Sequence, residues 1–234
     1  MKRLSEEAVK FIKNYGRSYS TLSREMETQF GIKLSKSLIS YYKGSKPRIK
    51  PIDIMKLSEW ELEWLFGLYF ADGSKFKEKS YCYTIKFDLD KKRDTDIGER
   101  LVELLTRIGL KPTMSFDRNV LVVRVFSKNL YNIFPDKVDS YQPRNILAFA
   151  SGMIDGDGAV NERRTGAYIV QTYFENLMSY LTKNLGLTRY EQRGSNAGWT
   201  GIKITYYVPK SVCEVLKDKK YCVKLLRKIN KTNN

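Results

Sequence analysis

The chain has 234 residues, 42% of them hydrophobic, which is enough for one sizeable domain and a small one, and no run of about eighteen apolar residues predicts a membrane span. It has no histidine, which excludes histidine triads and histidine metal ligands. Its three cysteines form no C-x-x-C pair, which argues against a disulfide framework or a zinc site. The net charge is +16, with +8 in residues 1–58 and +6 in residues 217–234; this distribution favours contact with nucleic acid over the alternative of solubilising tails.

Three short helical patterns open the chain. Apolar spacing predicts helices over residues 6–14, 20–30 and 35–43, each followed by a glycine. The third helix is basic and rich in serine, which is typical of a helix-turn-helix, although an ordinary three-helix bundle would give the same pattern. We assign residues 1–46 to a helix-turn-helix-like DNA-binding segment and residues 47–56 to a basic, extended linker. The candidate DNA contacts in this segment are Lys36, Ser37, Ser40 and Lys43.

The rest of the chain contains a duplicated pattern. We expect two half-domains, residues 57–142 and residues 143–234, the second with a basic C-terminal tail. Each half has the order α, strands, α, strands, α, so the predicted fold class is α+β with a pseudo-twofold pair of αββαββα units. The predicted helices are 60–70, 97–108, 130–134, 175–185 and 211–216, and the predicted strands are 81–89, 121–126, 168–174 and 202–206.

Two similar segments, 65–73 and 150–158, lie 85 residues apart, each ends in an aspartate followed by glycine, and together they carry the candidate chemistry. Small residues at i and i+4, Gly67 with Ala71 in one copy and Gly152 with Gly156 in the other, would let two helices approach closely. Asp72 and Asp157 follow at the helix ends, where the helix dipole and mutual repulsion both disfavour a carboxylate. A divalent cation such as Mg²⁺ would reverse both penalties, so the pattern favours a metal-dependent phosphodiesterase.

Three other readings of the acidic segments are weaker. An aspartate–glycine turn after a helix is common, but two matching copies make a turn-only role improbable. A calcium loop at 155–158 lacks the glycine and the terminal glutamate that such a loop needs, because Val160 and Gly166 stand there. A glycosidase also uses two carboxylates, but the charge of +16 disfavours a sugar substrate.

The two segments resemble the nine-residue signature of the LAGLIDADG homing endonucleases, and the spacing of elements after each copy extends the resemblance over residues 57 to about 216. The resemblance implies a single-chain, pseudo-symmetric fold with the two motif helices packed together and two antiparallel sheets in the DNA major groove. It also implies Mg²⁺-dependent cleavage of both DNA strands with short 3′ overhangs, with Mn²⁺ as a substitute metal. Phe70 replaces the first acidic letter of copy one, and Ala150 and Ser151 depart from the start of copy two.

The resemblance also implies roles for single residues. Asp72 and Asp157 match the acidic metal-binding positions, and the backbone carbonyls of Ala71 and Gly156 are further candidate ligands. Lys128 and Lys210 match the context of a basic residue that assists catalysis. The remaining candidate DNA contacts, on or beside the strands, are Lys75, Lys86, Asp88, Arg124, Gln171, Lys203 and Thr205.

The predicted partner is double-stranded DNA with a long specific target site. We expect the protein to bind it as a monomer and to have no membrane partner. An intron RNA, as in a maturase, and a purely DNA-binding regulator on the same fold are the alternatives; both aspartates are present, which favours cleavage. The cysteine usage suggests a reducing intracellular compartment, either the cytoplasm or nucleoid of a prokaryote or an organelle matrix.

Overall fold

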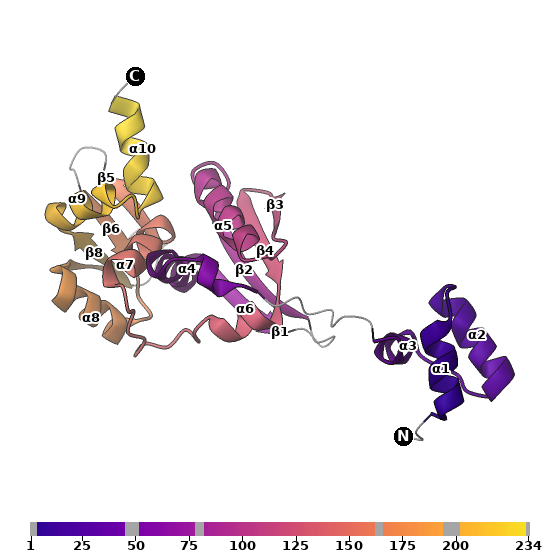
Figure 1. The fold of residues 1–234 in the computed structure, drawn as a ribbon. Coiled ribbons are helices and arrows are strands. Elements are labelled where there is room, and N and C mark those ends of the chain that lie inside the picture. The colour runs from indigo at the N-terminus through magenta and orange to yellow at the C-terminus, as the bar shows by residue number, and fades with distance from the viewer. Residues whose placement is uncertain (1–3, 45–51, 78–81, 162–165, 194–201, 233–234) are drawn as a thin grey trace. The chain divides into compact units, whose positions relative to one another are not determined.

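The computed structural model describes residues 4–44, 52–77, 82–161, 166–193 and 202–232 (Figure 1). The chain divides into two compact units, Met1–Lys50 and Pro51–Asn234. Each unit has its own cluster of buried apolar residues, and the two clusters have no member in common. Within the described ranges, no helix combines the length and the apolar character needed to cross a membrane.

The first unit contains three helices: α1 (Glu6–Asn14), α2 (Tyr19–Phe30) and α3 (Lys36–Tyr42). A serine caps each helix by accepting a backbone N–H bond, and the three caps are Ser5, Ser18 and Ser35. Six residues with buried side chains form the core: Ala8, Ile12, Leu22, Met26, Leu34 and Ile39. The three predicted helices are therefore present, whereas their use as a DNA-binding helix-turn-helix stays a prediction. Residues 47–51 of the predicted linker lie outside the described residues, and Ile54–Lys56 form a 3₁₀ turn, η1.

The first half of the second unit begins with the motif helix α4 (Glu59–Asp72), which starts at a capping box made by Ser58 and Glu61. A four-stranded antiparallel sheet follows, in the order β1-β2-β4-β3. After α4, the elements of this half are β1 (Gly73–Lys77), β2 (Tyr83–Asp90), α5 (Thr95–Arg107), β3 (Thr113–Asp117), β4 (Val120–Phe126) and α6 (Lys128–Ile133).

The second half repeats this arrangement from α7 (Ile146–Asp155), with a sheet in the matching order β5-β6-β8-β7. Its elements are β5 (Gly158–Asn161), β6 (Gly166–Val170), α8 (Glu175–Leu185), β7 (Thr188–Arg193), β8 (Ile202–Val208), α9 (Lys210–Asp218) and α10 (Val223–Thr232). The predicted duplicated α+β architecture is confirmed. One difference is the basic tail, because most of it forms the helix α10, whose Leu225 is fully buried.

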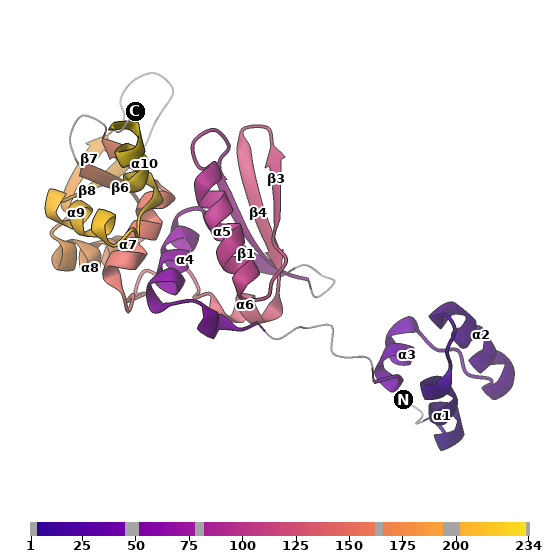
Figure 2. The same ribbon diagram turned by 45° about the horizontal axis from the view of Figure 1, so that its top comes forward.

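Helices α4 and α7 lie side by side between the two sheets (Figures 1 and 2). Both are apolar on nearly every face, and the buried residues of α4 run almost without interruption from Glu61 to Phe70. This composition is expected of helices that are covered by a sheet on one side and by each other on the second. The ends of α4 and α7 therefore meet at the centre of the unit, where the two halves join.

Candidate active site

The two motif helices touch through their backbones. A Cβ atom added to Gly67 would lie 2.0 Å from the carbonyl oxygen of Phe149, and one added to Gly152 would lie 2.2 Å from that of Trp64. Such distances are too short for any side chain, so only glycine permits this crossing. The predicted close approach through small residues is thus what brings the C-terminal ends of α4 and α7 together.

Asp72 and Asp157 lie at this meeting point and are both partly buried. Burial raises the pKa of the Asp72 carboxyl to about 7, and the charge of Asp157 contributes to that rise. Burial also raises the pKa of Asp157. Gly156 makes room for the pair, because a Cβ there would lie 2.3 Å from the Cβ of Ala71 and 3.0 Å from Asp72 Oδ2. Two partly buried acids that repel each other are chemically suited to share a hard cation.

Lys137 reaches this site from the segment that follows α6. Its Nζ donates to the carbonyl oxygen of Gly73, at 2.6 Å, directly after Asp72. The ammonium also lies 5.1 Å from the centre of the Tyr69 ring. Burial lowers the pKa of Lys137, while the charges of Asp157 and Asp72 oppose that shift. Lys137 is thus a partly buried cation, and the charges of both aspartates act on it.

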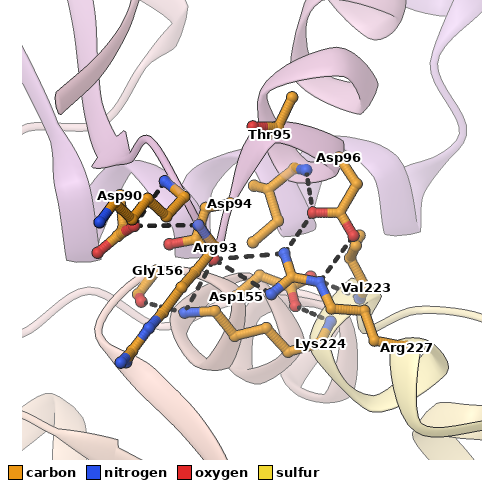
Figure 3. A network of polar contacts seen from close by, with 12 residues as sticks. Asp90, Arg93, Asp94, Thr95, Asp96, Asp155, Gly156, Val223, Lys224 and Arg227 are labelled. Carbon is orange, nitrogen blue, oxygen red and sulfur yellow. Dashed lines mark hydrogen bonds and ion pairs between the residues drawn. The ribbon is translucent and has the colours of Figure 1, made fainter. Parts of the chain in front are cut away.

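Lys224 reaches the same site from the first turn of α10 (Figure 3). Its Nζ donates to the carbonyl oxygens of Gly156, at 2.8 Å, and Gly158, at 2.9 Å, on either side of Asp157. It also lies 3.8 Å from Oδ1 of the buried Asp94. The charge of Lys224 lowers the pKa of both Asp72 and Asp157. Each aspartate is therefore next in sequence to a residue whose carbonyl accepts a hydrogen bond from a lysine.

Lys137 and Lys224 are functional candidates that the sequence reasoning missed. Gly73 and Gly158 are equivalent positions in the 85-residue repeat, and the lysines that bind them are 87 residues apart. A repeated lysine at nearly the same offset as the aspartates was the available signal. It was hidden because both lysines follow the last predicted helix of each copy, where a basic residue suggests a solvated surface.

The lysines that the sequence predicted make other contacts. Lys128 lies over the Tyr83 ring, with Nζ 5.6 Å from the ring centre, and the mostly exposed Lys210 lies 3.7 Å from Glu214. Lys75 donates to the carbonyl of Phe134 at 2.8 Å and pairs with Asp136 at 2.7 Å. None of these contacts involves either aspartate, and the catalytic role of Lys128 and Lys210 stays a prediction.

Three of the predicted DNA contacts of the first sheet, Lys86, Asp88 and Arg124, share one face, whereas Lys75 of β1 is in register with Ile85 and lies on the other face. Lys86 and Arg124 are directly opposed across β2 and β4, and Ser74 and Thr113 extend the row to β1 and β3. Asp88, two residues along β2, lies on the same face and pairs with Lys86 at 2.8 Å. This arrangement gives a polar row that crosses all four strands.

In the second sheet, Lys203 and Thr205 are two residues apart on β8 and share a face, with Lys203 exposed and Thr205 buried. Gln171 is buried, and its Oε1 accepts the backbone N–H groups of Thr172 and Tyr173, each at 3.0 Å. Gln171 thus serves at least a local structural role, in turning the chain after β6.

In the first unit, Lys36 and Ser37 are exposed on α3 and Ser40 is partly buried. Lys43 donates to the carbonyl of Tyr15 and lies 5.5 Å from the centre of the Tyr19 ring. Of the four predicted DNA contacts here, Lys36 and Ser37 are therefore the most accessible, and Lys43 holds α3 against the rest of the unit.

No family model matches the chain. An uncharacterized protein of Methanocaldococcus jannaschii is 30% identical over 172 residues, which cover 67% of this chain and 60% of that relative. The chain therefore spans less than two thirds of the relative's length.

Similar solved structures include I-DmoI in complex with DNA and Mn, with a TM-score of 0.50 at 17% identity over 68% of this chain and 95% of that chain. I-DmoI in complex with DNA and Ca gives a TM-score of 0.51 at 17% identity, over 68% of this chain and 88% of that chain. A further I-DmoI structure is described as that of a homing endonuclease. Together with the two signature segments at the crossing of α4 and α7, these similarities establish that the chain has the LAGLIDADG homing endonuclease fold.

Proposed function

We propose that this chain is a site-specific DNA endonuclease that cleaves both strands of a long target site by Mg²⁺-dependent hydrolysis and leaves 3′ overhangs. The observation that supports this most is the pair of partly buried aspartates, Asp72 and Asp157, at the joined ends of the motif helices. The similar structures of I-DmoI are complexes with DNA, which agrees with the proposal.

The donor set at the aspartates fits a divalent cation. Asp72 and Asp157 would hold it through their carboxylates, and the carbonyl of Ala71 is a further candidate. The carbonyl of Gly156 already accepts a hydrogen bond from Lys224, so it would have to share its lone pairs. When bound, the metal would supply charge neutralisation at the scissile phosphate and a more acidic water. Mn²⁺ is expected to substitute, because it accepts the same oxygen ligands.

Two pairs of lysines are candidates for the basic role beside the metal. We favour Lys137 and Lys224 over Lys128 and Lys210, because their ammonium groups bind the carbonyls of residues adjacent to the aspartates. From there they can donate hydrogen bonds to a phosphate oxygen and stabilise the charge that develops in the transition state. Burial lowers the pKa of Lys137, which suits that lysine to proton transfer.

DNA would lie against the polar faces of the two sheets. The row formed by Lys86 and Arg124 would contact base edges in the major groove, and Lys203 and Thr205 would do so from the second sheet. Lys75 would contact the DNA phosphate backbone near Asp72. The three-helix unit would lengthen the site through Lys36 and Ser37 on α3.

The test uses a DNA substrate in which the two chromosomal sequences that flank the gene are joined directly, as they would be if the gene had not been inserted between them. Purified full chain with Mg²⁺ should cut this DNA in both strands, and end sequencing should give 3′ overhangs. Asp72→Asn and Asp157→Asn should each abolish cutting, while Asp218→Asn, at an exposed acid at the end of α9, should leave it unchanged. Absence of any double-strand cut, or full activity of either site variant, would contradict the proposal.

A further inference from the structure

The carboxylate of Asp155 is fully buried at the end of α7, and four donors surround it. Oδ2 accepts from Trp64 Nε1 at 2.8 Å and from the backbone N–H of Val223 at 2.9 Å. Oδ1 accepts from the backbone N–H of Lys224 at 2.8 Å and from Cys222 Sγ at 3.2 Å. Each oxygen therefore receives two donors, which is the full capacity of an ionised carboxylate.

Two of these donors are the first amides of α10. The leading N–H groups of a helix have no partner inside it, and the same end carries partial positive charge. Asp155, more than sixty residues away along the chain, supplies both an acceptor and a negative charge at this end. It therefore fixes where α10 begins, and Lys224 is the second residue of that helix.

The far side of Lys224 is also held. Asp94, which is 5% exposed, lies 3.8 Å from Lys224 Nζ and 3.3 Å from Arg227 Nη2, one turn further along α10. Arg227 also binds Asp96, with Nε to Oδ2 at 2.7 Å. Figure 3 shows this clamp, in which acids from the start of α5 face the basic side chains of α10. The first turn of α10 is thus tied to both halves of the unit.

The first copy of the motif lacks this arrangement. The position that corresponds to Asp155 in the 85-residue repeat is Phe70, which packs against Tyr141, Phe149 and Phe174. Lys137, unlike Lys224, is not part of a helix, because it lies in the irregular segment between α6 and α7. A buried carboxylate cap therefore serves the lysine of one half only.

We propose that Asp155 is a positioning residue: it holds the first turn of α10 so that the Lys224 ammonium stays at the paired aspartates. The proposal rests on the proposed endonuclease function and deepens it, because it assigns different roles to the two aspartates of the second motif, Asp155 and Asp157. Asp157 would act on metal and substrate, and Asp155 would act only through Lys224.

A double-mutant cycle in the full chain tests this. Asp155→Asn should slow single-turnover cleavage at saturating enzyme by roughly tenfold to a hundredfold, while the Kd for target DNA in Ca²⁺ changes less than about twofold. In the Lys224→Met background, Asp155→Asn should cause no further loss. In the Lys137→Met background it should cause its full loss. Equal additional losses in both backgrounds would overturn the proposal.

Glu63→Gln is the matched control. Glu63 is a buried carboxylate on the other motif helix and likewise accepts a backbone N–H, that of Arg144, at 3.1 Å. Its contacts lie with Tyr141 and Arg144 rather than with Lys224, so Glu63→Gln should lower the melting temperature without changing the cleavage rate of the folded protein. A comparable slowing by Glu63→Gln would show that general destabilisation explains the effect.

A second variant and a second measurement cover the case in which Asp155→Asn does not fold. Arg227→Met removes the partly exposed outer tie and should also slow cleavage, non-additively with Lys224→Met. Hydrogen exchange should show the amides of Val223 and Lys224 protected in the native chain and in Glu63→Gln, and exposed in Asp155→Asn. Unchanged protection overturns the positioning role even if the chain cleaves DNA, whereas a native chain that never cleaves refutes the endonuclease function on which the role rests.

Discussion

Asp72 is a partly buried acid beside a second acid, and a helix end adds to its cost because the C-terminal dipole is also negative. Its raised pKa of about 7 means that, without a cation, ionising it opposes folding. A protein that keeps such a residue gains from a partner that binds the ionised form. The nearby lysines offset part of the cost, but both are engaged with backbone carbonyls.

We expect Asp72→Asn to raise the melting temperature of the metal-free protein at neutral and higher pH. The folded-state pKa is about 7 and the unfolded value is 3.8, so the folded state holds its proton more tightly. Stability from this group is fully present below the unfolded pKa and is lost as the pH rises through about 7. The stabilisation by Asp72→Asn should therefore be small near pH 4 and largest near pH 8. Thermal melts in EDTA measure it.

The same melts with Mg²⁺ complete that experiment. Metal binding should stabilise the native chain above pH 7, because a ligand that binds only the folded state raises its stability. Asp72→Asn should gain much less from the metal, and Asp218→Asn should behave as the native chain does. A native chain whose melting temperature ignores Mg²⁺ at pH 8 would argue against a metal at the aspartates.

The choice between the two lysine pairs gives a second prediction. Lys137→Met should reduce the single-turnover cleavage rate by about 10²–10³-fold, the loss typical of removing one donor to a developing oxyanion. Lys128→Met should leave the rate within about threefold, because Lys128 lies over the Tyr83 ring. Quenched-flow cleavage with both variants decides it, and the reverse ranking would restore Lys128 as the catalytic candidate.

The crossing of α4 and α7 depends on two glycines that meet the backbone of the opposite helix. We expect Gly152→Ala to cost at least about 3 kcal/mol, since a Cβ there lies 2.2 Å from a backbone oxygen and 2.7 Å from a backbone nitrogen, and neither can move without separating the helices. Gly98→Ala on α5 is the control. Its nearest neighbour is the tip of the Leu121 side chain, which can turn away, so the loss should be smaller. Urea unfolding of both variants provides the comparison.

Local patterns accounted for most helices and for four of the eight described strands, β2, β4, β6 and β8, because alternation and helical spacing are properties of short segments; they missed the edge strands β1, β3, β5 and β7. They failed where a side chain redirected the backbone: the strand expected over 168–174 ends at Val170, since Gln171 takes the amides of Thr172 and Tyr173 and turns the chain. The paired aspartates were visible because their motif is repeated. The contacts of Asp155 and Lys224 were not, because they join residues more than sixty positions apart, which no local pattern records.

The basic C-terminus illustrates the same limit for charge. Lysines and arginines counted along residues 217–234 suggest a solvated or DNA-bound tail. In the folded unit, Lys224 and Arg227 instead pair with acids at the start of α5, and Lys224 also donates hydrogen bonds to the carbonyls on either side of Asp157. Two of the seven basic residues of this segment are therefore paired with acids elsewhere in the unit, so its local charge of +6 overstates the positive charge that it can offer to DNA.

The independence of the two units gives the last prediction. Residues 51–234 should fold without the first unit, because no buried core residue is shared between them. If the three helices bind DNA, removing residues 1–50 should weaken the Kd for target DNA while leaving the single-turnover rate at saturating enzyme within about twofold. The slope of log Kd against log salt should also fall by about one for each phosphate that the shortened chain no longer neutralises. In the full chain, Lys36→Gln on exposed α3 should reproduce part of this change, whereas Lys10→Gln on α1 should not. An unchanged Kd and salt slope after the deletion would show that the three-helix unit does not contact the target DNA.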